Sequence, residues 1–185
     1  MLDYLDKIVS LDNIHQWEER DSIIKESVSQ HSFKVACIAI YLLRKLRCND
    51  LQFVADVVMY ANLHDFDESI IMRDLPHPIK YNKDNGDEIR RVIDEYVNLQ
   101  LEKNDWNFIK DFSKEVKLFV KVCDWISLIT FIRRNALQGS ILFANDHQYC
   151  MECIDRSFNT LDAIQIKFDN FSYIKELKQQ IKNEW

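Results

Sequence analysis

The sequence contains few of the residues that shape tight turns, because only two glycines and two prolines occur among its 185 residues. An all-β fold needs many turns, for which these residues are the usual choice, so their scarcity argues against that class. Neither Gly86 nor Gly139 belongs to a glycine-rich phosphate loop. Nucleotide-binding folds that depend on such a loop are therefore excluded.

An excess of positive charge is also missing, and so is any long apolar run. The 24 Lys and Arg residues are outnumbered by 30 Asp and Glu residues, for a net charge of −6. No cationic field would therefore attract nucleic acid or an anionic membrane surface. No apolar segment approaches the ~20 residues of a membrane-spanning helix, and the N-terminus lacks the pattern of a signal peptide. We expect a cytoplasmic protein without a nucleic-acid or membrane partner.

Every long segment repeats its hydrophobic residues with a period of about 3.6, which is typical of helices. The pattern predicts an all-α fold, a compact bundle of about six to eight helices. No linker or repeat divides the chain, so we predict a single domain over residues 1–185. The prolines place an extended loop at residues 74–81. The predicted helices cover residues 2–9, 24–47, a stretch from a cap at Asn49 or Asp50 to Leu63, 86–101, 113–137, 144–167 and 171–183.

An adjacent His64 and Asp65 stand at the end of one apolar helical segment. Imidazole nitrogen and carboxylate oxygen are good ligands for divalent transition ions, and neighbours at a helix end can reach the same ion. A surface pair at the end of a helix is the plainer interpretation of the dipeptide alone. The metal hypothesis therefore needs further residues.

Three other residues strengthen that hypothesis. His31 lies near the start of a strongly apolar helix, and Asp124 lies within an apolar helical face. A buried carboxylate without a partner is costly, so either a metal ion or a hydrogen bond to a neighbouring helix cap is needed to explain Asp124. Glu68 follows His64 by one turn, on the same side of a helix. There it could position or protonate groups around a metal-bound water.

The order of these residues resembles the H…HD…D signature of the HD phosphohydrolase superfamily. The segments NIHQW, ESVSQHSFKVA, LHDFDESIIMRDLPHPIKY and VKVCDWISL resemble the bacterial 5′-deoxynucleotidases of that superfamily. They also resemble related phage-encoded enzymes that cut triphosphate from dATP. The similarity spans residues 13–140, and the helices of 144–185 would pack on this HD-type domain.

The resemblance implies a metal-dependent phosphohydrolase. Glu68 would orient the attacking water or shuttle a proton, and Lys80 would neutralise charge that builds on the phosphate. The ion would lower the pKa of a bound water, and it would be one divalent ion: Co, Mn, Zn, Ni, Fe or Mg. Its ligands would be His31, His64, Asp65 and Asp124.

The resemblance also implies how a deoxynucleotide is held. Asp74 would hydrogen-bond the deoxyribose 3′-hydroxyl, Trp17 would pack where a 2′-hydroxyl would clash, and His77 would line the base pocket. Without the resemblance, Trp17 would be read as a core anchor and Lys80 as a solvated loop lysine.

Three positions depart from the family pattern. Gln16 stands where the family usually has a phosphate-binding arginine, and Gln30 stands where it has a glutamate before the first metal-binding histidine. Arg73 replaces a glycine before the loop aspartate. This arginine would either supply the missing cation from another direction or face the solvent.

The leading hypothesis is a 5′-deoxynucleotidase that converts a deoxynucleoside monophosphate to deoxynucleoside and phosphate. A dNTP triphosphohydrolase, acting on dATP and encoded by a phage, is the nearest alternative; it would work in the host cytoplasm. A non-catalytic helical binding module is an alternative of another class. The family resemblance further implies a homodimer or a higher homo-oligomer.

Overall fold

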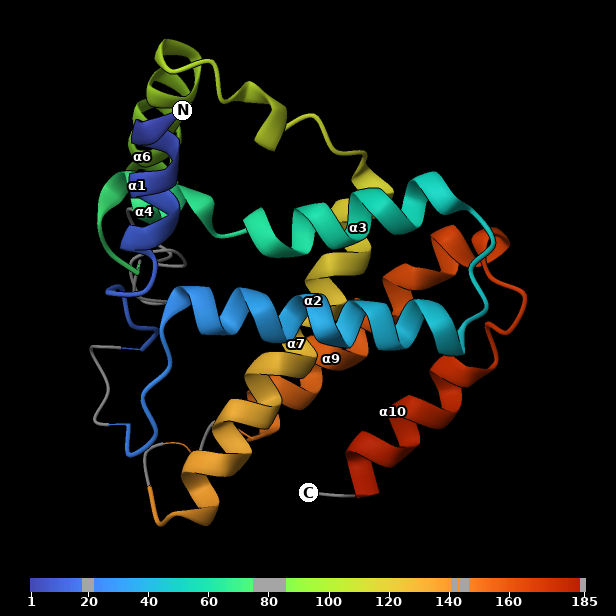
Figure 1. Cartoon of the computed structure of the whole chain (residues 1–185). Helices are drawn as coiled ribbons and strands as arrows, with labels where there is room; N and C mark the ends of the chain where they lie inside the picture. Colours follow the sequence, from blue (N-terminus) through green and yellow to red (C-terminus); the bar gives the residue numbers. More distant parts are fainter. Residues whose placement is uncertain (18–21, 75–85, 141–142, 144–146, 184–185) are drawn as a thin grey trace.

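The computed structural model describes residues 1–17, 22–74, 86–140, 143 and 147–183. The chain is folded from helices (Figure 1), which confirms the predicted all-α class. The elements in chain order are α1 (Leu2–Ser10), α2 (Val28–Lys45), α3 (Leu51–Leu63), α4 (Phe66–Ile71), α6 (Gly86–Lys103), η1 (Asn107–Ile109), α7 (Lys114–Leu137), α9 (His147–Thr160), η2 (Leu161–Lys167) and α10 (Tyr173–Asn183).

Side-chain caps fix where three of these helices begin. The Ser27 hydroxyl accepts from the Gln30 backbone N–H, and the Gln30 side chain accepts from the Ser27 N–H in return. This capping box starts α2 at Val28, so the predicted start at residue 24 is wrong. Asp50 and Ser113 cap α3 and α7 by accepting the backbone N–H three residues later.

A large hydrophobic cluster, here called the main core, lies among α2, α3, α7, α9, η2 and α10. Helix α2 packs against both α3 and α7, and α7 also packs against α9. Figure 1 shows α2 and α7 crossing at the centre of this group. Three aromatic rings pack together within it, with centroids 5.7–6.1 Å apart, and they belong to Phe53, Phe119 and Phe168. The main core holds α2 and α7 firmly against each other.

A smaller cluster, here called the second core, lies among α1, α4, α6 and η1. Its buried members are Phe66, Ile70, Val97, Leu101, Trp106 and Ile109. Tyr4 of α1 stacks on Phe66 at 5.3 Å and meets Trp106 edge-on at 5.8 Å. Lys7 donates a hydrogen bond to the Ser69 carbonyl at 3.0 Å. Ring packing and this hydrogen bond therefore hold helix α1 against the short helix α4.

Two elements were not predicted, and a third differs from its prediction. Helix α4 and the 3-10 turn η1 are too short to show a period in the sequence. The segment predicted as one helix over residues 144–167 is helix α9 followed by the 3-10 segment η2. Of the predicted loop at 74–81, the structure describes only Asp74. None of the described helices combines the length and the apolar character that crossing a membrane requires.

Candidate metal centre

Two histidines and an aspartate meet where α2 passes the junction of α3 and α4. His31 lies in the first turn of α2, while His64 and Asp65 separate the end of α3 from the start of α4. One ligand atom from each of the three lies within 4.8 Å of the other two. His64 is the C-cap of α3 and Asp65 is the N-cap of α4, so neither is held inside a helix and these neighbours can face one point.

Asp124 of α7 joins this group through His31. Its Oδ1 lies 3.0 Å from His31 Nε2, and Asp65 Oδ2 lies 3.8 Å from the same nitrogen. His64 Nε2 lies 3.2 Å from Asp65 Oδ2. The four side chains predicted as metal ligands therefore converge, although they come from three separate stretches of chain.

The environment of His64 fits a metal ligand. Its Nδ1 lies 2.9 Å from the Ala61 carbonyl, which can only accept, so Nδ1 carries the proton. Its Nε2 is buried and, although Asp65 Oδ2 lies 3.2 Å away, forms no hydrogen bond with any residue that the structure describes. A histidine bound in this way directs an unprotonated nitrogen at the centre. The donor set of imidazole nitrogens and carboxylate oxygens suits a divalent transition ion.

Charges around the centre also favour a cation. Burial opposes protonation of His31, but hydrogen bonds with Asp124 and Glu26 raise its pKa to about 10. Burial likewise opposes ionisation of Asp124, yet the Lys121 ammonium and His31 hold the pKa of that carboxyl well below its usual range. Lys121 Nζ lies 2.6 Å from Asp124 Oδ2. Asp124 is thereby kept ionised, as a metal ligand must be, and an ion bound to His31 would take the place of one ring proton.

One residue beside the centre was missed by the sequence analysis. Glu26 is buried, with an exposed fraction of 2%, and its Oε1 lies 3.5 Å from His31 Nδ1. The predicted helix from residue 24 hid this contact, because residues five apart lie on different faces of a helix. In the structure, Glu26 precedes the helix. The capping residues Ser27 and Gln30 carried the signal for that boundary.

Gln16 and Trp17 lie on a loop beside the centre. The Gln16 side-chain amide is 3.4 Å from Asp65 Oδ2, so it contacts a predicted metal ligand. The backbone N–H of Trp17 donates to Asp74 Oδ2 at 2.9 Å, and Trp17 adopts a left-handed φ of 60°. Its ring meets Phe143 edge-on at 6.1 Å. The structure thus brings the predicted sugar-binding pair, Trp17 and Asp74, together.

Of the remaining predicted site residues, the structure describes two, one buried and one exposed. Glu68 is buried on α4, 2% exposed, one turn after the His64–Asp65 pair. Arg73 is exposed. Lys80 and His77 lie outside the described residues.

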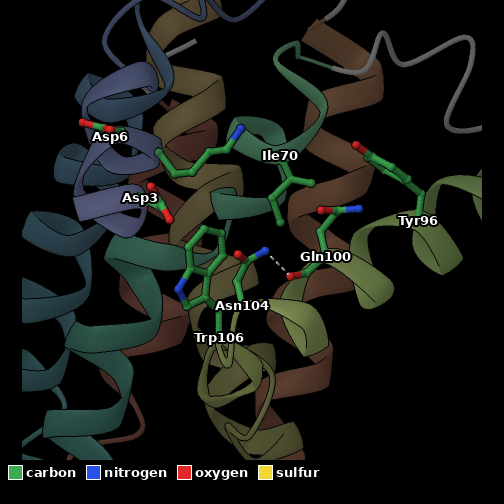
Figure 2. Close-up of a pocket in the computed structure, with 8 residues that line it drawn as sticks. Asp3, Asp6, Ile70, Tyr96, Gln100, Asn104 and Trp106 are labelled. Carbon is green, nitrogen blue, oxygen red and sulfur yellow. Dashed lines mark hydrogen bonds between the residues drawn. The ribbon is translucent and has the colours of Figure 1, made fainter. Parts of the chain in front are cut away.

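A separate pocket of about 350 Å³ lies between α1, α4 and α6 (Figure 2). Its lining mixes carboxylate, amide and aromatic side chains, and includes Ile70 of α4 and Trp106 of the second core. None of the predicted site residues lines it. Among the described residues, the lining consists of Asp3, Asp6, Lys7, Ile70, Tyr96, Gln100, Asn104 and Trp106.

Known proteins resemble this chain in sequence pattern and in fold. The sequence profile of the 5′-deoxynucleotidase YfbR-like family matches residues 3–159. No curated protein sequence matches the chain. The solved structure of a Pyrococcus horikoshii protein has a similar fold, with 19% identity, a TM-score of 0.68 and 98% of each chain covered.

Two similar structures are HD phosphohydrolases. One is the cyanophage S-2L enzyme DatZ bound to dA and one catalytic Zn²⁺, with 16% identity, a TM-score of 0.65 and 96% of each chain covered. The other is an HD-domain phosphohydrolase of Listeria innocua, with 18% identity and a TM-score of 0.61. That match covers 100% of this chain and 99% of the other. At these identities the likeness establishes the fold.

Proposed function

The chain belongs to the YfbR-like 5′-deoxynucleotidase family, and on that premise we propose that it removes the 5′-phosphate of deoxynucleoside monophosphates at the candidate metal centre. Membership makes it a metal-dependent phosphohydrolase of small deoxynucleotides. The observation that carries the assignment of the site is the convergence of His31, His64, Asp65 and Asp124. The buried, hydrogen-bond-free Nε2 of His64 supports it, within the described residues.

The proposed reaction is the hydrolysis of a phosphate ester. A divalent ion held by the four ligands would lower the pKa of a bound water and polarise the phosphorus. Glu68 orients the attacking water and accepts its proton. As the water oxygen bonds to phosphorus, the bond from phosphorus to O5′ breaks, and Glu68 passes the proton that it took from the water to that oxygen. The products are a deoxynucleoside and orthophosphate.

The substrate contacts are part of the same proposal. Asp74, oriented by the Trp17 N–H at 2.9 Å, hydrogen-bonds the 3′-hydroxyl of the sugar. The Trp17 ring occupies the space that a 2′-hydroxyl would need, which selects deoxyribose. Lys80 neutralises phosphate charge and His77 lines the base pocket. The Gln16 amide carries no charge, so it orients Asp65 and does not replace an arginine.

Zinc is the metal we propose first, because the DatZ structure of similar fold holds one catalytic Zn²⁺.

We further propose that the protein acts in the cytoplasm as a homodimer. One face of α2 leaves large apolar side chains exposed, with Phe33 at 66%, Ile40 at 52% and Tyr41 at 50%. Such a face suits a two-fold interface. Sedimentation analysis of wild type and Ile40→Glu would test the dimer.

A product assay tests the proposed function. Metal-stripped protein is incubated with each dNMP, NMP and dNTP while Zn, Co, Mn or Mg is added back. We expect orthophosphate from dNMPs and little from NMPs, and His64→Ala should abolish it while Asn62→Ala, an exposed change two residues earlier, leaves it intact. Release of intact triphosphate from dATP would replace the nucleotidase with a triphosphohydrolase. If no metal gave any product and the protein bound no metal, the non-catalytic helical binding module would be the remaining hypothesis.

A further inference from the structure

Glu26 carries a carboxylate in the protein interior, where carboxylates are rarely found without partners. Its side chain is 2% exposed, and it precedes α2 in the loop that leads to the capping residue Ser27. A buried carboxylate needs partners of opposite charge or good hydrogen-bond donors. Two are in reach: Lys34, one and a half turns into α2, and His31. The Glu26 side chain therefore lies between a cation and a predicted metal ligand.

The contact with His31 is made on the ring nitrogen that faces away from the centre. Glu26 Oε1 lies 3.5 Å from Nδ1, while Nε2 faces Asp124 and Asp65 at 3.0 and 3.8 Å. A carboxylate only accepts, so the Glu26 contact calls for a proton on Nδ1, while the closer Asp124 calls for one on Nε2, and without an ion the ring carries both. An ion bound at Nε2 would displace only the proton there, and Glu26 would keep the one on Nδ1. This is the arrangement in which an outer carboxylate increases the basicity of a metal-binding imidazole.

A second oxygen competes for the same nitrogen. Ser127 Oγ of α7 lies 3.3 Å from His31 Nδ1, slightly closer than Glu26. A hydroxyl can donate as well as accept, so Ser127 alone does not decide which ring nitrogen carries the proton. A charged acceptor also binds an N–H more strongly than a neutral one. Of the two neighbours, Glu26 is the one that determines the ring's tautomer.

We propose that Glu26 is a positioning residue of the metal centre, which holds His31 with Nδ1 protonated and Nε2 directed at the ion. Lys34 is its counter-ion, and it moderates how much of the carboxylate's charge reaches His31. This inference rests on the proposed function, because it presumes that His31 binds a metal. It adds an outer carboxylate to the four ligands.

The side chain can be changed without breaking the loop that carries it. The Glu26 backbone carbonyl accepts from the Gln16 N–H at 2.9 Å, and Ser27 with Gln30 forms the capping box. Neither set of bonds uses the Glu26 carboxylate. A substitution of the side chain therefore tests its effect on His31 with the surrounding backbone contacts kept.

The test measures the affinity of the full-length protein for Zn²⁺ and Co²⁺ by competition with a chromophoric chelator. Glu26→Ala is expected to weaken metal binding by roughly 10- to 100-fold, the usual effect of losing an outer partner. Glu26→Gln keeps a neutral acceptor and should recover part of that loss. Ser127→Ala is the matched control at the same nitrogen and should weaken metal binding less than Glu26→Ala does, because it removes a neutral partner. The visible spectrum of bound Co²⁺ should shift in the Glu26 variants and not in the control.

Lys34→Met separates an effect through His31 from a merely structural one. Removing the cation leaves the full charge of Glu26 facing His31, so metal affinity should be unchanged or tighter while thermal stability falls. If Glu26 only stabilised the loop, both variants would lower stability and neither would change the Co²⁺ spectrum. That result, or a Glu26→Ala protein that binds metal like wild type, would overturn the inference while leaving the proposed function intact. A wild-type protein that binds no metal would overturn both.

Discussion

The main core and the second core differ in size and in what they contribute to the candidate metal centre. The main core joins α2 to α7, and so sets His31 against Asp124 across 93 residues of sequence at 3.0 Å. The second core surrounds α4, which begins directly after Asp65 and carries Glu68. The main core therefore fixes His31 and Asp124, while the second core fixes Asp65 and Glu68.

Because of this difference, substitutions in the two cores should have different effects, one mainly on global stability and the other mainly on metal binding. Burial of apolar surface is the main source of stability, and the larger cluster buries more of it. Local opening is favoured where few apolar contacts must be broken. We expect the second core to open before the molecule unfolds. Loss of its packing should then cost metal binding and activity more than it costs global stability.

The largest effect is expected from Phe119→Ala in the main core. Phe119 is fully buried and contacts the rings of Phe53 and Phe168 at 5.9 and 5.7 Å. The cavity should lower the free energy of unfolding by about 3–5 kcal/mol. Denaturant titration followed by circular dichroism measures it. Activity should fall only as the folded fraction falls, and a change below about 1 kcal/mol would mean that the main core is not the stabilising region.

Trp106→Ala makes the matching change in the second core. Trp106 is 9% exposed, and its ring meets Phe66 edge-on at 5.7 Å. We expect a local loss of about 3 kcal/mol, with a smaller shift in global unfolding because only part of the structure depends on this cluster. Hydrogen exchange should accelerate in α4 and α6 but not in α2 and α7, and metal affinity should fall. Uniform acceleration in all four helices would erase the distinction between the two cores.

The sequence predicted the main core better than the second core, for physical reasons. Long helices such as α2 and α7 repeat their apolar positions often enough to be recognised, whereas α4 has only six residues. The approach of Asp124 to His31 is a tertiary contact that no helical period contains. The family resemblance, carried by the order of His31, the His64–Asp65 pair and Asp124, supplied that grouping. Glu26 was missed because its helix was predicted to begin too early.

A smaller effect is expected from Lys7→Met, which loosens the attachment of α1 to α4. The substitution keeps the length of the side chain but removes the hydrogen bond to the Ser69 carbonyl at 3.0 Å. Losing one such bond should cost about 1 kcal/mol. Hydrogen exchange of α4 is the appropriate measurement, with Lys117→Met on α7 as the control, since Lys117 also donates to a backbone carbonyl. Equal effects on α4 exchange from both variants would contradict a specific role for α1.

The smallest effect is expected from Asp155→Asn at the surface of the larger region, where α9 meets α10. Burial opposes ionisation of Asp155, but Lys178 and Lys182, at 3.0 and 3.2 Å, lower its pKa below the usual 3.8. Because the folded-state pKa is the lower one, the ion pairs stabilise the protein above the unfolded pKa and are lost as the pH falls through the folded value. Asp155→Asn should therefore cost at most about 1 kcal/mol at pH 7, less in high salt, and nothing at low pH. Urea titrations at pH 7 and near pH 3 measure the difference. A larger cost at pH 7 would mean that α10 depends on charge more than on the packing of Ile174 against the main core.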